Sequence, residues 1–91
     1  MALTKNEAVE KARQDLAKRL KVSDSEIDNQ TVEDVDFPDM ALGAGADGEM
    51  SGQMMTKGWR IRLQSKGQTL EYRADKNQVR LYNYKGENFL L

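Results

Sequence analysis

Hydrophobic and polar residues alternate along the last third of the chain. The apolar members of three successive runs are Trp59, Ile61 and Leu63, then Leu70, Tyr72 and Ala74, then Val79 and Leu81. A period of two is typical of a strand with one buried face. The pattern predicts strands over 58–65, 68–74 and 79–84, and the tail, 85–91, is left without an element.

Turn lengths fix how these strands pair. A two-residue turn at Lys66-Gly67 pairs Ser65 with Gln68, and a four-residue loop sets Ala74 opposite Val79. The other predicted pairs are Leu63 with Leu70, Ile61 with Tyr72, Trp59 with Ala74, and Tyr72 with Leu81. A slip of one residue would move the apolar side chains to the other face, so the register is well specified.

The first segment has the pattern of a helix. Thr4 and Glu7 have capping-box spacing, in which each side chain bonds a backbone N–H of the first turn. Apolar residues then recur at steps of three and four, at Val9, Ala12, Leu16 and Leu20. We expect a helix over 5–21 whose apolar stripe covers the apolar face of the sheet.

The middle of the chain has less periodicity. Residues 31–37 are rich in β-branched residues and read as a strand, which Pro38 ends. Residues 39–56 hold glycines and methionines without a period, and are expected to form a long loop. The whole predicts a single α+β domain with two layers, one N-terminal helix packed on a three- to four-stranded antiparallel sheet.

Composition excludes several kinds of chemistry. The chain has 91 residues, no cysteine and no histidine, which excludes disulfides, Cys/His zinc sites and an imidazole base. Ser51 and Ser65 therefore have no histidine to activate them, and we expect no enzyme activity and no cofactor. No apolar run approaches a membrane span. The expected location is the cytoplasm, or outside the cell if an export signal has been removed.

The net charge of −1 hides three blocks of unlike charge. Residues 1–21 carry +3, residues 22–56 carry −9 with no basic residue, and residues 57–91 carry +5. The register puts Arg60, Arg73 and Arg80 in one row on the outward sheet face. Arg62, Glu71 and Tyr82 form the next row, and Gln64, Thr69 and Tyr84 a third.

A row of arginines needs an explanation because like charges directly opposite one another destabilise a sheet. The row is interpreted in three ways. It is an anion-binding platform with tyrosines for stacking, a solvated face shielded by arginine stems, or the partner of the chain's own acidic segment.

The loop 39–56 is a second candidate site. Met40 and Leu42, beside a glycine run, suit a protruding tip that inserts into a groove of a partner protein. The alternative is that Met54 and Met55 only fill gaps in the core.

Carboxylates gather in the same region. Asp34, Asp36, Asp39, Asp47 and Glu49 would be oxygen ligands for a hard cation. Their spacing does not fit an EF-hand loop, and a solvated acidic strand edge explains them without a metal. No metal site is therefore predicted.

Several short motifs carry a family resemblance. In chain order they are Leu20-Lys21-Val22, Ile27, Val32-Glu33-Asp34-Val35, Phe37-Pro38-Asp39, Leu42-Gly43, Met54-Met55, Gly58-Trp59-Arg60-Ile61, Gly67 and Leu70-Glu71-Tyr72. This series resembles an uncharacterised family of small bacterial, largely cyanobacterial, domains. The chain departs from that pattern at Phe37 (tryptophan there), at Ala44 (cysteine) and at Lys57 (proline).

The helix–strand–strand–strand order is also similar to PepSY-type domains, a resemblance that implies a binding or inhibitory module, for example for a hydrolase. Neither resemblance supplies a catalytic residue. We expect a monomeric, non-enzymatic protein-binding module that uses the 39–56 loop, the basic sheet face, or both. The alternative function is binding of nucleic acid or an anionic ligand on the arginine–tyrosine face.

Overall fold

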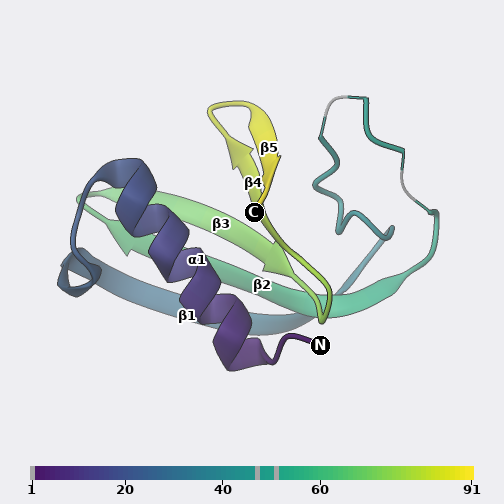
Figure 1. Cartoon of the computed structure of the whole chain (residues 1–91), viewed down its shortest axis with the longest axis horizontal. Coiled ribbons are helices and arrows are strands. Elements are labelled where there is room, and N and C mark those ends of the chain that lie inside the picture. The colour runs from purple at the N-terminus through teal and green to yellow at the C-terminus, as the bar shows by residue number, and fades with distance from the viewer. Residues whose placement is uncertain (1, 47, 51) are drawn as a thin grey trace.

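The computed structural model describes residues 2–46, 48–50 and 52–91, and over these residues one α-helix packs on a five-stranded antiparallel sheet (Figure 1). In chain order the elements are α1 (Lys5–Leu20), η1 (Asp24–Glu26), β1 (Ile27–Phe37), β2 (Thr56–Ser65), β3 (Gln68–Ala74), β4 (Val79–Tyr84) and β5 (Glu87–Leu90). The strands lie side by side in chain order. The predicted α+β architecture is confirmed, with one strand more than expected.

Helix α1 begins with the predicted capping box. The Glu7 N–H donates to Thr4 Oγ1 at 3.1 Å, and the Thr4 N–H donates to Glu7 Oε1 at 2.9 Å. The helix ends one residue earlier than predicted, because Lys21 turns into the left-handed region at φ 55° and its N–H still reaches the Ala17 carbonyl. No helix in the described part of the chain is long and apolar enough to cross a membrane.

The main core lies between α1 and one face of the sheet (Figure 1). The helix buries the residues of its apolar stripe, Ala8, Val9, Ala12 and Leu16. The sheet contributes Ile61, Leu63, Leu70, Tyr72, Ala74, Val79 and Leu81, all buried. Apolar side chains on one face of each strand thus account for how the helix docks.

A polar contact crosses this core. The Tyr72 hydroxyl is fully buried and donates to Asp15 Oδ2 of α1 at 2.7 Å. Burial, and next the hydrogen bond to Asp15, raise the pKa of Tyr72. Arg19 pairs with the same carboxylate at 3.1 Å and lies over the Phe89 ring of β5 at 4.6 Å. The end of α1 is therefore fixed to both the middle and the edge of the sheet.

Both predicted hairpin registers are observed. Ser65 pairs with Gln68, and Ala74 pairs with both Trp59 and Val79. Lys66 and Gly67 both have positive φ, 50° and 77°, as the tight turns that match strand twist require.

Strand β1 is longer than the predicted 31–37. It begins at Ile27 and pairs with β2 down to Phe37 opposite Thr56, with a shift of register between Ile27 and Asn29. Of the added residues, Asp28, Asn29 and Gln30 are polar and exposed and only Ile27 packs on the main core, and β1 forms one edge of the sheet. A strand at an edge with little burial has no hydrophobic alternation to reveal it.

The tail 85–91 was predicted to lack an element, which is wrong, because it forms β5. Lys85 and Gly86 take positive φ values of 52° and 84° and turn the chain back, as Lys66 and Gly67 do. The third predicted row is also wrong at Tyr84. Asn83 has φ 51° and the β4–β5 register shifts there, so the Tyr84 ring packs on the helix side beside Phe89.

Candidate functional site

The arginine row forms as predicted on the sheet face opposite α1. Arg60 pairs with Arg73 across β2 and β3, and Arg73 pairs with Arg80 across β3 and β4. Arg62, Glu71 and Tyr82 form the adjacent row. What matters for function is whether these guanidinium groups face solvent or are already matched by internal carboxylates.

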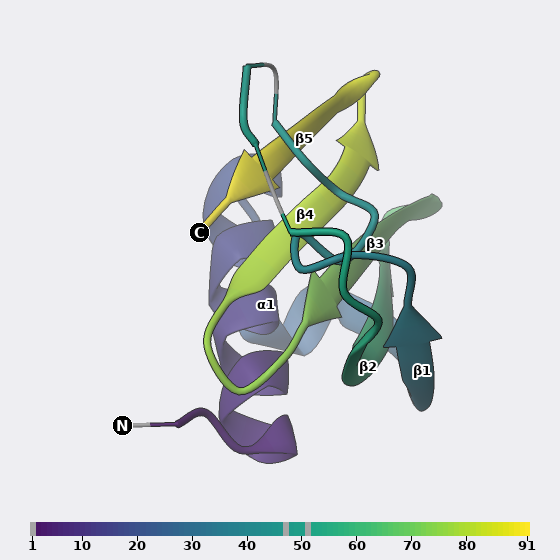
Figure 2. The same ribbon diagram turned by 90° about the vertical axis from the view of Figure 1, so that its right-hand side faces the viewer.

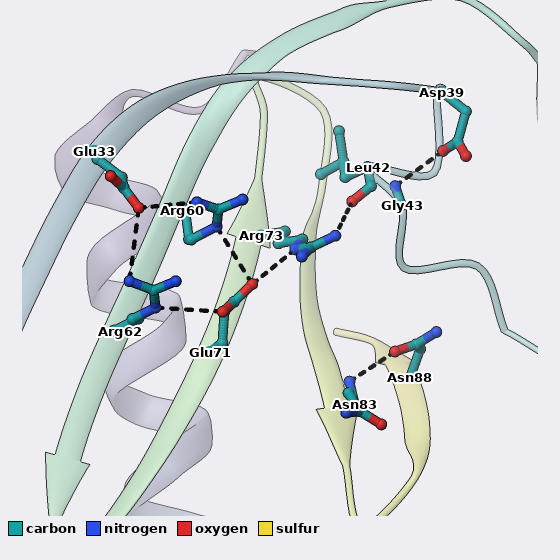
Figure 3. A network of polar contacts seen from close by, with 10 residues as sticks. All are labelled: Glu33, Asp39, Leu42, Gly43, Arg60, Arg62, Glu71, Arg73, Asn83 and Asn88. Carbon is teal, nitrogen blue, oxygen red and sulfur yellow. Dashed lines mark hydrogen bonds and ion pairs between the residues drawn. The ribbon is translucent and has the colours of Figure 1, made fainter.

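Glu71 lies at the centre of this face and meets three guanidinium groups (Figure 3). Its carboxylate oxygens are 2.9 Å from Arg73 Nε, 3.3 Å from Arg62 Nε and 3.4 Å from Arg60 Nε. Glu33 of β1 adds contacts of 3.0 Å to Arg60 and 3.8 Å to Arg62. Two carboxylates thus neutralise much of the charge of three arginines.

Arg80 is held by the long loop. The residue is 4% exposed, and its two terminal nitrogens each lie 2.6 Å from an oxygen of Glu49. It also donates to the Ala44 carbonyl at 3.3 Å. The hydrogen bonds from Arg80, and next the N–H of Ala46, lower the pKa of Glu49 to about 2. Arg80 is therefore an internal anchor for the loop.

Arg73 is covered on both sides. Its guanidinium carbon lies 3.6 Å from the centre of the Tyr82 ring and 5.5 Å from that of Phe37. It donates to the Leu42 carbonyl at 3.0 Å (Figure 3). Of the three interpretations of the row, pairing with the acidic segment describes Arg60 with Glu33 and Arg80 with Glu49, whereas Arg73 pairs with Glu71 of the sheet itself. Arg62 is the most open of the four arginines, with 49% of its side chain exposed.

In the loop between β1 and β2, residues 42–45 and Glu49 lie on the sheet face opposite α1 and next to the β4–β5 hairpin (Figures 1 and 2). Four apolar residues outside the main core are buried here, Phe37, Ala41, Leu42 and Ala44, each at most 1% exposed. Asp39 Oδ1 accepts the N–H groups of Ala41 and Gly43 and so closes the turn. The expected protruding tip is therefore wrong at Leu42, which is fully buried, whereas Met40 is half exposed.

The acidic residues have separate partners. Asp34 pairs with Lys5 at 2.9 Å, Asp39 caps its turn, and Glu49 binds Arg80. Among the residues that the structure describes, no three His, Cys, Asp or Glu side chains gather in a way that would hold a metal ion. Asp47 and Ser51, which the sequence brought into consideration, lie outside the described residues.

A groove of about 880 Å³ opens at the end of the sheet where β1 ends, β2 begins and β3 turns into β4. We call it the methionine groove. It is lined by Asp34, Val35, Asp36, Met40, Met54, Met55, Thr56, Lys57, Gly58, Trp59, Asp75, Lys76, Asn77 and Gln78. Its three methionines are 50%, 66% and 73% exposed in chain order, so Met54 and Met55 do not fill the core as the alternative held.

Local hydrogen bonds set the shape of this groove. The Met40 N–H donates to the Gly52 carbonyl at 3.0 Å, which joins the two limbs of the loop. Gln78 Nε2 donates to the Met40 carbonyl at 2.7 Å and ties the loop to the β3–β4 turn. Sequence reasoning missed the contribution of that turn. The predicted pairing of Trp59 with Ala74 was a signal for it, because it places residues 75–78 beside the start of β2.

Comparison with known proteins gives one finding. The family described as "Domain of unknown function (DUF8738)" matches residues 9–82, a range that contains the arginine face and every residue of the methionine groove. No curated protein and no solved structure matches this chain.

Proposed function

Since this chain belongs to the DUF8738 family of small domains, whose function is not known, we propose from its geometry that it is a protein-binding module. The methionine groove receives an apolar segment of the partner. The helix–strand–strand–strand order is similar to that of PepSY-type domains, and this similarity implies that the bound partner is a hydrolase that the chain inhibits. The proposal includes no catalytic step.

The observation that carries this proposal is the exposure of methionine. Apart from Leu90, the exposed large apolar residues of the described chain are Met40, Met50, Met54 and Met55. Methionine is flexible and polarizable, which suits a surface that adapts to the side chains of a partner. Three of these residues line one groove, so their exposure is gathered at one place on the surface.

The arginine–tyrosine face supports the alternative function less well. Arg60 and Arg73 contact Glu71, Arg80 contacts Glu49, and the Tyr82 ring is covered by Arg73. An incoming phosphate would have to displace these internal carboxylates. Binding of nucleic acid would therefore depend mainly on Arg62 and on the lysines outside this face.

The test is capture of partner proteins from lysate on immobilised chain, with matched variants. We expect a captured protein to be lost with the triple change Met40→Ser, Met54→Ser and Met55→Ser. The same protein should be retained with Met50→Ser, which alters a still more exposed methionine outside the groove lining. A control with Arg62→Glu should leave capture unchanged.

Salt separates the two candidate functions. Apolar docking should respond little to added salt, whereas binding to a phosphate backbone falls steeply between low and physiological salt. Capture that persists in the triple serine variant, or that disappears with Arg62→Glu and with moderate salt, would overturn the groove proposal in favour of the basic face.

A further inference from the structure

The methionines among the described residues are exposed, whereas nearly all the leucines and isoleucines are not. Met40, Met54 and Met55 are 50%, 66% and 73% exposed. Every described leucine and isoleucine except Leu90 is buried or packs on the main core. An apolar groove needs only apolar volume, which leucine supplies. The presence of methionine at all three positions indicates that the sulfur atom itself has a role in binding.

We propose that the methionine groove binds one soft monovalent metal ion, Cu(I), through the thioether sulfurs of Met40, Met54 and Met55. Thioether and thiolate sulfurs are the protein ligands that select Cu(I) over harder cations. The chain has no cysteine and no histidine, so thioethers are its only soft ligands.

The three methionines line the same groove and come to it from both limbs of the loop. Met40 lies on the limb that follows β1, and Met54 and Met55 lie on the limb that precedes β2. The hydrogen bond from the Met40 N–H to the Gly52 carbonyl closes the limbs on each other. The Met40 sulfur packs so closely on Gly52 that a Cβ atom there would lie 2.6 Å from it.

The other lining residues also favour a soft cation. Trp59 lines the groove, and an indole ring is the best aromatic partner for a cation. Asp34, Asp36 and Asp75 balance Lys57, Lys76 and the Lys5 that pairs with Asp34, so the groove has no excess of positive charge to repel a cation. Zn²⁺ and Ca²⁺, which prefer imidazole, thiolate or carboxylate ligands, find no cluster of three such side chains among the described residues.

Leucine substitutions separate this inference from the proposed function. Met→Leu retains apolar volume and removes the sulfur, so it should abolish metal binding and leave protein docking in place. The experiment measures Cu(I) affinity of the full chain without oxygen, by competition with bicinchoninate, for wild type and for Met40→Leu, Met54→Leu, Met55→Leu and the triple variant. Met50→Leu is the matched control, because Met50 lies in the same loop and is 96% exposed but does not line the groove.

We expect binding of one Cu(I) per chain. Loss of an outer-shell partner already weakens metal binding about 10- to 100-fold, so loss of one ligating sulfur should cost more than about tenfold. The triple variant should bind no Cu(I) in competition with the chelator, and Met50→Leu should bind like wild type. Thermal unfolding of each variant without metal should match wild type, which confirms that the fold is intact.

A second measurement identifies the ligands directly. Ag(I), a redox-inert analogue of Cu(I), should shift the methyl NMR signals of Met40, Met54 and Met55 and leave that of Met50 in place, while Zn²⁺ should shift none of them. Absence of Cu(I) binding, equal loss with Met50→Leu, or binding that survives in the triple leucine variant would each overturn the inference. None of these results would affect the capture experiment, because that experiment depends on apolar contact.

Discussion

Replacement of Glu71 by glutamine tests whether the arginine face is held together by internal charge pairing. Glutamine keeps the shape of the side chain and removes its charge. Among the described residues, the three guanidinium groups of Arg60, Arg62 and Arg73 are then left with Glu33 as their one remaining carboxylate partner. Because like charges opposite one another destabilise a sheet, the variant should lower the free energy of unfolding.

The size of the loss follows from the exposure of each pair. Arg73 and Glu71 are 13% and 19% exposed and 2.9 Å apart, and a hydrogen bond to a charged group with little exposure contributes about 1.5–3 kcal/mol. Arg60 and Arg62 are 26% and 49% exposed, and such surface pairs contribute about 0.2–1 kcal/mol each. The expected loss is about 2–5 kcal/mol. For a chain of this size it lowers the melting temperature by about 8–40 °C.

The assay is urea unfolding followed by the fluorescence of Trp59, the single tryptophan, and by circular dichroism. Glu33→Gln is the matched control: it removes a carboxylate from the same face that is 52% exposed, so it should cost less than about 1 kcal/mol. Added sulfate should stabilise Glu71→Gln more than wild type, because the anion replaces the missing charge. A loss for Glu71→Gln no larger than that for Glu33→Gln would refute the reasoning.

Three further predictions concern the loop and the helix contact. The depressed pKa of Glu49 adds stability that is complete above its ordinary pKa of 4.5 and is lost as pH falls through about 2. Unfolding measured from pH 5 to 2 should therefore show a loss of stability in wild type that Glu49→Gln lacks. The same pH profile in both proteins would contradict the pairing of Glu49 with Arg80. Leu42→Ala should cost about 2–5 kcal/mol in urea unfolding, since Leu42 is fully buried, and a change below about 0.5 kcal/mol would mean that the loop is not docked. Tyr72→Phe leaves the Asp15 carboxylate without its buried donor and should cost about 1–3 kcal/mol in the same assay, whereas an unchanged stability would exclude that hydrogen bond.

Strict alternation made the sheet predictable. In β2 and β3 the apolar residues occupy every second position, and the turn at Lys66-Gly67 leaves one register that keeps them on one face. The arginine row follows from that register without further assumption. The same register places Glu71 beside the row, but it does not reveal the partner of Arg80, because Glu49 approaches from a loop whose path no periodicity describes.

Two misses had different physical causes. Strand β5 has four residues and little burial, yet its turn repeats the Lys-Gly pair of the first hairpin at Lys85-Gly86, and that repetition was a usable signal. The burial of Leu42 had no such signal. Leu42 has φ 61° and Gly43 has φ 66°, and the turn that they form depends on Asp39 and Arg73, which are distant from each other in sequence.

The chain-order arrangement of the strands has a consequence for folding kinetics. Strands β2 to β5 follow one another through short turns, so their pairing requires little loop-closure entropy. Strand β1 joins β2 only when residues 38–55 close, which is the most expensive closure in the sheet and should come late. The methionine groove takes its walls from both sides of that closure, from Asp34 to Met40 and from Met54 to Gln78. A ligand of the groove would therefore bind only chains that have completed this step, and would slow unfolding by holding β1 in place.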